Sequence, residues 1–305
     1  MALISVIIPC YNCGNFISRA INSVLKQSFS NWELLLVDNN STDNTLSILE
    51  SYVQKFPNKI KIYKETKQGA PAARNKGLKK ANGKWIQFLD ADDEILPAKL
   101  EGQYALAIKK RASFVAGPYT LLEFHSKASR IRTLYMEDFW IALVKSQMGI
   151  TSANLWNREL LIAAGGWDEE LIASQEYDLM FRMLQLSPIV GFDNRNLTII
   201  HIEQGESVSR GGNDLKGQMI MESKIVLRFQ IKDYLFKNNL LTNDRLYFID
   251  KFIYQTLIKN YRYWPVFIVN KLKQTNLEVT LLEKMKGIYF RRKMDLRSII
   301  VKKDN

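Results

Sequence analysis

Short apolar runs alternate with helix-like segments near the start of the chain, and this alternation restricts the possible folds more than any other feature. Most runs are continuous rather than alternating with polar residues, as expected for strands that are buried on both faces of a sheet. Strands that alternate with helices in this way predict a largely parallel, doubly wound α/β sheet. The predicted strands are residues 5–9, 34–38, 59–63 and 85–89, and the predicted helices between them are residues 16–25, 46–56 and 70–81.

The pattern changes along the rest of the chain. From residue 113 to 213 strand and helix signals are mixed, with a short strand predicted at residues 152–156 and a mobile loop at residues 204–213. From residue 215 onward the chain reads as helical, basic and rich in Tyr, Phe and Leu. Ser41 or Thr42 is expected to cap the helix at residues 46–56.

Three carboxylates, Asp90, Asp92 and Asp93, directly follow the apolar run at residues 85–89. Like charges at this spacing raise one another's pKa or attract a cation. Because they follow a strand, they are expected at the sheet edge where open α/β folds bind their ligands. Oxygen ligands favour Mg²⁺ or Mn²⁺, ions that commonly hold a phosphate-bearing substrate. The alternative is a solvated acidic turn ahead of a helix that starts near Pro97.

The positive charge is concentrated in the last part of the chain. The formal net charge is +12, and residues 221–305 carry 18 Lys and Arg against 8 Asp and Glu, which is +10. Such a segment favours an anionic partner, either a membrane surface or a nucleic acid. The alternative is a basic helical face that is simply solvated.

Cys10 and Cys13 form a C-x-x-C pair. The two histidines of the chain lack the paired spacing that a structural zinc site would need. A redox pair that opens a helix after a strand remains an alternative. The sequence has no apolar run near the roughly 18 residues of a membrane span and no basic N-terminal segment, so a cytoplasmic location is expected.

Six short stretches together resemble one family. They are IIPCYN at residues 7–12, VDNNSTD at 37–43, GAPAARN at 69–75, FLDADD at 88–93, GGWDE at 165–169 and QEYDL at 175–179. In this order and spacing they resemble the family 2 glycosyltransferases, which are inverting enzymes of the GT-A fold. The resemblance covers residues 3–210 and implies a mixed, mostly parallel sheet flanked by helices. It assigns residues 1–214 to a catalytic domain that binds the nucleotide sugar and the acceptor. Residues 215–305 carry no such resemblance and are predicted from their composition to form a basic helical extension.

The resemblance also implies a nucleotide site. Asp38 ends the second strand, where the family's carboxylate helps to hold the base, and Asn39 stands where many members have a second Asp. An amide can still pair with uracil, and a UDP-sugar is the expected donor. Arg74 would add positive charge near the phosphates. The residues assigned to the nucleotide are Pro9, Tyr11, Asn12, Asp38, Asn39, Arg74, Asp90 and Ala91.

Asp90-Ala91-Asp92 is similar to the D-x-D motif of the family. The resemblance implies that Asp92 holds a Mn²⁺ or Mg²⁺ ion that bridges the two phosphates, with Asp93 assisting. His201 is considered as a further metal ligand. A cation there stabilises the charge that develops on the departing nucleoside diphosphate. A packed or exposed His201 without such a role is the alternative.

Glu176 is the predicted general base, because inversion needs a single carboxylate that takes the proton of the attacking hydroxyl. The competing candidate is Asp178, which on a helix would lie about 200° around the axis from Glu176. Trp167 and Asp168 are predicted to contact the acceptor, with core packing as the alternative for Trp167.

The expected acceptor is a sugar or a lipid-linked saccharide in cell-surface polysaccharide assembly. The aromatic and basic stretches at residues 261–264 and 289–293 then suggest peripheral docking on the inner, anionic face of the cell membrane, and nucleic acid is not expected. One alternative is a nucleotidyltransferase, which would need a glycine-rich phosphate loop after the first strand that this chain lacks. Another is a non-catalytic protein that binds sugar nucleotides or nucleic acid.

Overall fold

The computed structural model describes residues 3–123, 126, 128–202 and 214–301, with side chains up to residue 291. Contacts divide the chain into two units, residues 1–171 with 175–205 and residues 172–174 with 206–305. The loop predicted at residues 204–213 lies outside the described residues. The predicted domain boundary after residue 214 stays a prediction.

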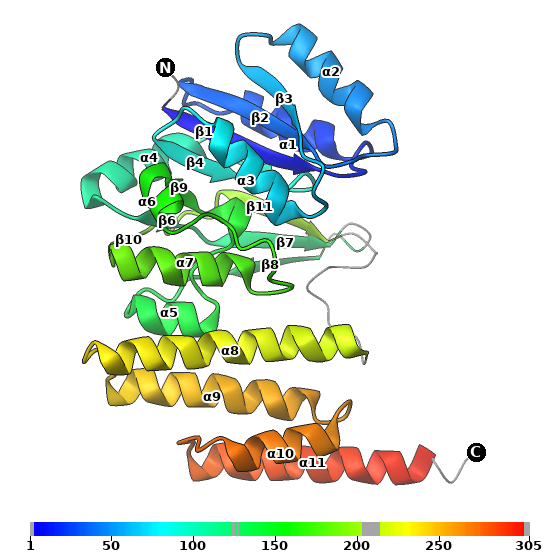
Figure 1. The fold of residues 1–305 in the computed structure, drawn as a ribbon, viewed down its shortest axis with the longest axis vertical. Coiled ribbons are helices and arrows are strands. Elements are labelled where there is room, and N and C mark those ends of the chain that lie inside the picture. The colour runs from blue at the N-terminus through cyan, green and yellow to red at the C-terminus, as the bar shows by residue number, and fades with distance from the viewer. Residues whose placement is uncertain (1–2, 124–125, 127, 203–213, 302–305) are drawn as a thin grey trace. The chain divides into compact units, whose positions relative to one another are not determined.

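The first unit is built on a mixed sheet of seven strands (Figure 1). Only β9 runs antiparallel to its two neighbours, and the other paired strands are parallel. The predicted mixed, mostly parallel α/β fold is therefore confirmed. In spatial order the strands are β10 (Val190–Phe192), β6 (Phe114–Ala116), β9 (Leu155–Asn157), β4 (Trp85–Phe88), β1 (Ile4–Cys10), β2 (Trp32–Asp38) and β3 (Ile60–Lys64).

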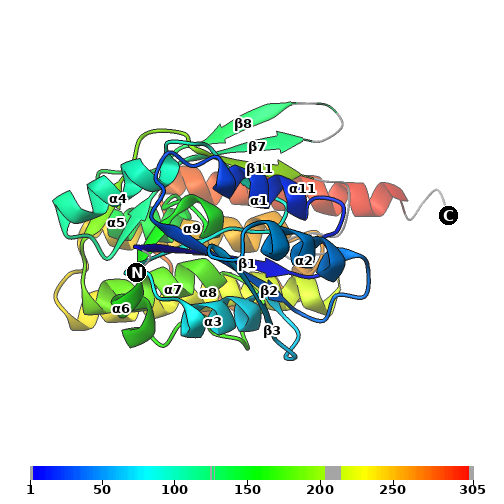
Figure 2. The same cartoon turned by 90° about the horizontal axis from the view of Figure 1, so that it is seen from above.

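Helices cover both faces of this sheet, with α1 and α4 on one face and α3 on the other (Figures 1 and 2). The alternation of β1 explains the arrangement. Ile4, Val6 and Ile8 belong to the core formed with α1 and α4, whereas Ile7 lies against Gly77 of α3. The helices of this unit are α1 (Ile17–Leu25), α2 (Thr45–Lys55), α3 (Ala70–Lys80), α4 (Lys99–Lys110), α5 (Phe139–Lys145), α6 (Arg158–Ala163) and α7 (Gln175–Leu186).

A second sheet of four strands adjoins the carboxylate cluster, and β7, β8 and β11 run side by side in Figure 2. Its first strand begins directly after Asp93. The sequence did not predict most of this sheet, because its strands are short and half-exposed. Its order is β5 (Glu94–Ile95), β11 (Thr198–Ile202), β7 (Tyr119–Glu123) and β8 (Ser129–Arg132).

Strand register brings the predicted site segments to one edge. Cys10 at the end of β1 pairs with Asp38 at the end of β2, and Ile7 pairs with Phe88 at the end of β4. The segments that follow these strands therefore leave the sheet from the same edge, as in other parallel α/β sheets.

Two local predictions were wrong. The helix α2 begins at Thr45, and neither Ser41 nor Thr42 caps it; the Asp43 carboxylate accepts a hydrogen bond from the Thr45 N–H instead. The strand predicted at residues 152–156 begins later, because the 3₁₀ turn η1 (Thr151–Ala153) precedes β9. Ser152 uses its side chain and carbonyl for hydrogen bonds to the β4 segment, which fixes this turn.

The second unit consists mainly of the helices α8 (Leu215–Lys237), α9 (Asn243–Asn260), α10 (Pro265–Gln274) and α11 (Leu281–Val301). The helix α9 packs against each of the other three. Asp250 of α9 is fully buried, and it accepts hydrogen bonds from the Lys232 ammonium at 2.8 Å and from the Glu278 N–H at 2.8 Å. Within the described residues, no helix combines the length and the hydropathy needed to cross a bilayer.

Candidate functional site

The three carboxylates after β4 occupy different environments. Asp93 is buried and accepts a hydrogen bond from the Ser152 hydroxyl at 2.6 Å. The Asp90 side chain is 35% exposed, and Asp92 is half-buried. Burial raises the pKa of the Asp93 carboxyl well above its usual value, and the charges of Asp90 and Asp92 raise it further. Asp93 is therefore a carboxyl group whose negative charge is disfavoured in this environment.

Arg74 of α3 brings a positive charge to the first of these carboxylates. Its guanidinium donates to the Asp90 carboxylate at 2.6 Å and lies 4.6 Å from the centre of the Trp167 ring. Its side chain is 8% exposed. Within the described chain, the buried Nε–H of Arg74 has no hydrogen-bond partner, so one donor beside the carboxylates remains unsatisfied.

Arg19 of α1 brings a second cation to this edge. Its guanidinium donates to the Asp92 carbonyl at 2.6 Å and lies 3.7 Å from the Glu94 carboxylate. His201 of β11 forms a 2.6 Å hydrogen bond with the same Glu94 carboxylate through Nε2. The structure therefore places His201 beside the cluster, with Nε2 engaged by Glu94.

The carboxylates fit a divalent ion that is shared with phosphates. Within the described part of the chain, no three His, Cys, Asp or Glu side chains are grouped as a complete metal site. Mg²⁺ typically takes only one or two protein carboxylates together with substrate phosphates, so such a group is not required. The repulsion of the Asp93 charge by Asp90 and Asp92, which raises the pKa of Asp93, is the feature that a cation would relieve.

The segments after β1 and β2 are joined by hydrogen bonds. The side-chain oxygen of Asn12 accepts a hydrogen bond from the Thr42 N–H at 2.8 Å, and the Asn12 N–H donates to the Ser41 hydroxyl. Asp38 is buried and accepts from the Ser41 N–H at 3.3 Å. Pro9 is half-buried, and Tyr11 is 52% exposed, which leaves its ring open to a ligand.

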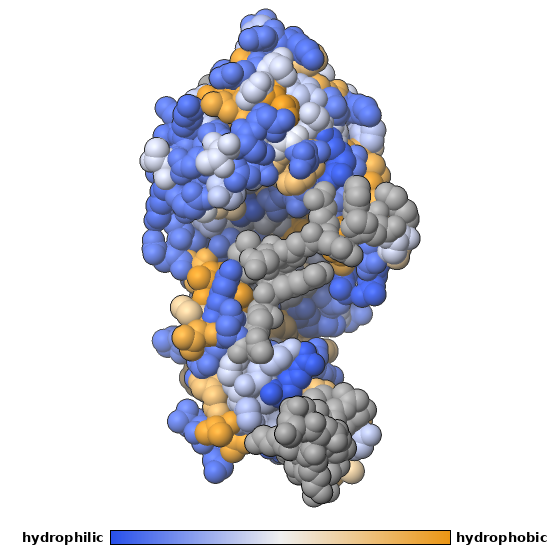
Figure 3. All heavy atoms as spheres, turned by 90° about the vertical axis from the view of Figure 1, so that its right-hand side faces the viewer, coloured by the Kyte–Doolittle hydropathy of each residue, from blue (hydrophilic) through white to orange (hydrophobic). Residues whose placement is uncertain are grey.

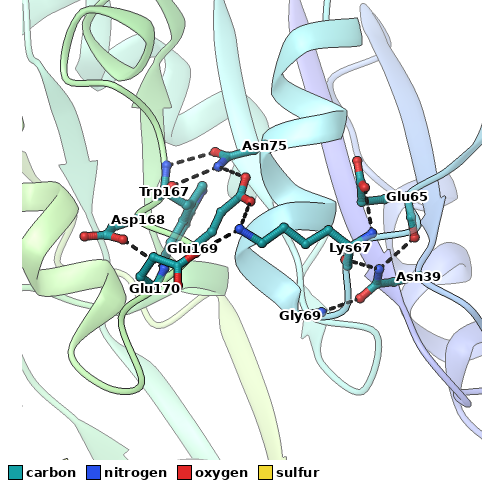
Figure 4. Close-up of polar contacts among 9 residues, drawn as sticks. All are labelled: Asn39, Glu65, Lys67, Gly69, Asn75, Trp167, Asp168, Glu169 and Glu170. Carbon is teal, nitrogen blue, oxygen red and sulfur yellow. Dashed lines mark hydrogen bonds and ion pairs between the residues drawn. The ribbon is translucent and has the colours of Figure 1, made fainter.

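Asn39 has a structural role that the sequence did not indicate (Figure 4). Its amide donates to the carbonyls of Glu65 and Lys67 at 2.8 and 2.7 Å, and its oxygen accepts from the Gly69 N–H at 2.7 Å. Both amide hydrogens are thereby used within the protein. The predicted base contact of Asn39 stays a prediction, and any such contact would have to use its remaining acceptor capacity.

A polar network then links the segment after β3 to the GGWDE stretch (Figure 4). The Lys67 ammonium lies 2.9 Å from both the Glu169 and Glu170 carboxylates, and these pairs raise the pKa of Lys67. The Asn75 amide donates to the Trp167 carbonyl and to Glu169, each at 2.8 Å. These contacts hold two segments that are about 100 residues apart in the sequence next to each other.

The two predicted acceptor residues differ in exposure. Trp167 is 2% exposed, and its ring packs edge-on against Phe88 at 5.2 Å, so core packing accounts for the ring. Asp168 is exposed and accepts from the Glu170 N–H at 2.9 Å. Gly166, at φ 69°, turns the chain into this segment, where a Cβ would collide with Asn75.

Glu176 and Asp178 lie in the first turn of α7. Arg182 donates to Asp178 from Nε and Nη2, at 2.9 and 2.7 Å. Burial still raises the pKa of Asp178 despite this ion pair. Glu176 is half-buried, and its charge is among the influences that raise the pKa of Tyr119 at the start of β7, where burial is the largest. Asp178 is therefore committed to an ion pair, and Glu176 lies toward the second sheet.

One loop forms hydrogen bonds with both α7 and the turn that carries the carboxylates. The Tyr177 hydroxyl donates to the Gly149 carbonyl at 2.7 Å. Three residues further on, the Ser152 hydroxyl contacts Asp93 and also accepts from the Asp90 N–H at 3.0 Å. The segment 149–153 therefore contacts both the start of α7 and the carboxylate turn. Arg19, Glu94 and Ser152 were not predicted, and Arg19 lies on the side of α1 away from its buried apolar residues, so the helical pattern gave no signal for it.

The two cysteines are free thiols that are buried. Burial raises the pKa of Cys10, and the hydrogen bond between the two thiols lowers the pKa of Cys13. The hydroxyl of Thr45 also lies against Cys13, at 3.8 Å. The two thiols thus belong to the packed interior next to the segment that follows β1.

Residues 5–149 match the family model "Glycosyl transferase family 2". The glucosyltransferase WfgD of Escherichia coli, whose name gives UDP-Glc and GlcNAc-diphosphoundecaprenol as its substrates, is 41% identical over 128 residues, covering 41% of this chain and 48% of WfgD. TuaG of Bacillus subtilis, a putative teichuronic acid biosynthesis glycosyltransferase, is 40% identical over 121 residues, covering 39% of this chain and 48% of TuaG. The chain thus spans about half the length of these curated relatives.

The fold is similar to that of a solved structure. The crystal structure of S. aureus TarS 1-349 in complex with UDP-GlcNAc superimposes with a TM-score of 0.63 and 19% identity, covering 95% of this chain and 79% of that one. At this identity the match establishes the fold. It includes most of both units of this chain.

Proposed function

Since this chain carries a family 2 glycosyltransferase domain of the GT-A type, we propose that it transfers a sugar from a nucleoside-diphosphate sugar to an acceptor hydroxyl, with inversion. The observation that carries the proposal is the group of three carboxylates at the carboxyl end of β4, with Arg74 paired to the first of them. A UDP-sugar is the proposed donor. WfgD is named for UDP-Glc, and the TarS crystal contained UDP-GlcNAc, which supports this choice.

The carboxylates are proposed to hold Mn²⁺ or Mg²⁺ with the donor. Asp92 would be the principal ligand, as the second carboxylate of the D-x-D pattern; Asp90 also pairs with Arg74, and Asp93 is buried against Ser152. The bound ion would neutralise the diphosphate as its negative charge increases. Arg74 would contribute positive charge from the protein at the same place.

Glu176 is the proposed general base. A base must be able to accept a proton, and Asp178 is already paired with Arg182 through two hydrogen bonds. Glu176 is half-buried at the start of α7, which the segment 149–153 connects to the carboxylate turn. Glu176 would take the proton of the acceptor hydroxyl as that oxygen attacks the anomeric carbon.

The proposed acceptor is a lipid-linked saccharide in cell-surface polysaccharide assembly, at the cytoplasmic face of the membrane. The names of two relatives support this class: WfgD acts on a diphosphoundecaprenol-linked sugar, and TuaG is assigned to teichuronic acid biosynthesis. Exposed Asp168, beside the Lys67 network, is a proposed acceptor contact.

Calorimetric titration with UDP, GDP and dTDP, each with and without Mn²⁺, tests the donor site. We expect UDP to bind more tightly than GDP or dTDP, and to reach its full affinity only when Mn²⁺ is present. A screen of sugar nucleotides against lipid-linked and simple sugar acceptors, read by mass spectrometry, then tests transfer. Binding without transfer to any acceptor would favour a non-catalytic sugar-nucleotide binding protein, and no nucleotide binding at all would refute the proposal.

A further inference from the structure

The helix α11 packs on α9 through the side that carries Glu283 and Gly287. Glu283 is buried on that face and forms a 3.1 Å ion pair with Lys251 of α9. One turn later, Gly287 lies against the Tyr254 hydroxyl of α9, where a Cβ would leave no room. These contacts fix which side of α11 is covered within the second unit.

The opposite side of α11 is apolar and exposed. At about 100° per residue, its five apolar side chains fall within a sector of about 120°, centred roughly opposite Glu283 and Gly287. Their exposed fractions run from 41% to 74%. Figure 3 shows the wider setting, with hydrophobic areas interspersed among hydrophilic ones on the molecular surface. We call these residues the α11 face: Leu281, Leu282, Met285, Ile288 and Tyr289.

Cationic side chains border this face on both sides. By the same spacing, Lys286 lies along one edge, and Lys284 and Arg291 lie along the other. The nearest acidic residue of the helix, Glu283, points to α9. Over its whole length α11 contains six Lys and Arg against two Asp and Glu. An apolar stripe between two cationic edges is the arrangement found in helices that lie in a lipid–water interface.

We infer that the α11 face is a docking surface for an anionic lipid membrane. The apolar side chains would enter the headgroup boundary, while Lys284, Lys286 and Arg291 would meet acidic headgroups at its rim. Two copies of the face would bring like charges together, which disfavours a homodimer through it. Nucleic acid is disfavoured because aliphatic side chains dominate the centre and offer no stacking platform.

The inference revises the predicted membrane contact. In the stretch at residues 261–264, Tyr261 is buried, and Arg262 lies 4.3 Å from the Tyr263 ring. Of the stretch at residues 289–293, Tyr289 is exposed on the α11 face. Docking through this face does not depend on the proposed transfer reaction, so the two can fail separately.

Co-sedimentation of the full chain with vesicles tests the inference. We expect binding to phosphatidylcholine vesicles that contain phosphatidylglycerol, weaker binding as salt is raised, and little binding to phosphatidylcholine alone. The double variant Met285→Glu/Ile288→Glu should lower the partition coefficient by at least about tenfold, because two apolar side chains no longer enter the interface. The control Ile162→Glu changes an apolar residue of similar exposure on α6 and should leave binding unchanged.

Circular dichroism and urea unfolding establish that the variants fold. Failure of the wild-type chain to bind anionic vesicles at low salt would overturn the inference, as would equal binding by the double variant. Two further outcomes would also overturn the inference. If light scattering shows a dimer that Met285→Glu/Ile288→Glu disperses, the face binds a second copy of the chain. If the double variant loses RNA binding rather than vesicle binding, the face binds nucleic acid. Transfer to a soluble acceptor should be the same in all variants.

Discussion

Asp93 is the carboxyl group of the site whose negative charge is most disfavoured. It is buried, and two further carboxylates lie in the same turn. Its hydrogen bonds from the Ser152 hydroxyl and from the backbone of His201 offset only part of this cost, because neutral donors do not fully replace the hydration of a carboxylate. The proposed cation would relieve this unfavourable charge, and Asp92 is its proposed principal ligand.

We therefore expect Asp92→Asn to weaken UDP binding in the presence of Mn²⁺ by about tenfold or more, because a carboxylate ligand is lost. Without Mn²⁺ the variant and the wild type should bind UDP alike. Calorimetric titration measures both. Glu50→Gln, which removes one exposed negative charge on α2, serves as the control. Equal loss with and without Mn²⁺ would argue against Asp92 as a metal ligand.

Glu176→Gln should lower the transfer rate roughly 100- to 10,000-fold while UDP binding stays unchanged, because an amide keeps the shape of the side chain but does not take a proton at neutral pH. Asp178→Asn is the matched variant on the same helix. It should keep most of the activity and lower stability, since it breaks the ion pair with Arg182. Rates from mass spectrometry with saturating donor decide between them, and an active Glu176→Gln enzyme would exclude Glu176 as the base.

At the scale of elements, the buried strands were predictable, and among the half-exposed ones β3 was predicted whereas β5, β7 and β8 were not. The apolar runs of β1, β2 and β4 are fixed by burial on both faces, and their bounds differ from the predictions by at most two residues. Strands β5, β7 and β8 carry no continuous apolar run, so their pairing depends on tertiary contacts. The same holds for side chains: the sequence predicted the carboxylate cluster, but not Arg19 or Ser152, which reach it from distant segments.

The side chain of Asn39, in the loop after β2, holds the segment that follows β3. We expect Asn39→Ala to lower the free energy of unfolding by about 1–3 kcal/mol, because two carbonyls and one N–H lose a buried partner. Urea unfolding followed by tryptophan fluorescence measures the change. Asn58→Ala, at an exposed turn position before β3, should cost much less. A similar loss in both variants would mean that Asn39 does not hold this segment.

At the scale of the whole molecule, charge is distributed by unit. Several acidic side chains of the first unit form ion pairs, such as Asp90 with Arg74 and Glu169 with Lys67. The excess of basic residues belongs to the last 85 residues, from residue 221 on. Composition alone predicted this division, but not which face of which helix is exposed, since that depends on how α9 covers α11.

One buried lysine should contribute measurably to the pH dependence of the free energy of unfolding. Lys99 is fully buried, and its pKa is lowered to about 7, mainly by burial; the charge of Asp193 opposes this shift and that of Arg195 contributes to it. In the unfolded chain the amine keeps its proton up to a pH of about 10.4. Between these values the unfolded state binds more protons, so stability rises with pH, by at most about 1.4 kcal/mol per pH unit from this group. The neutral amine can still donate to Gln103 and to the Ala153 carbonyl.

Lys99→Met should therefore reduce the rise in unfolding free energy between pH 7 and 9, whereas Lys109→Met, at an exposed position of α4, should not. Urea titrations at several pH values give these slopes, and parallel slopes for the wild type and Lys99→Met would show that Lys99 is charged in the folded protein.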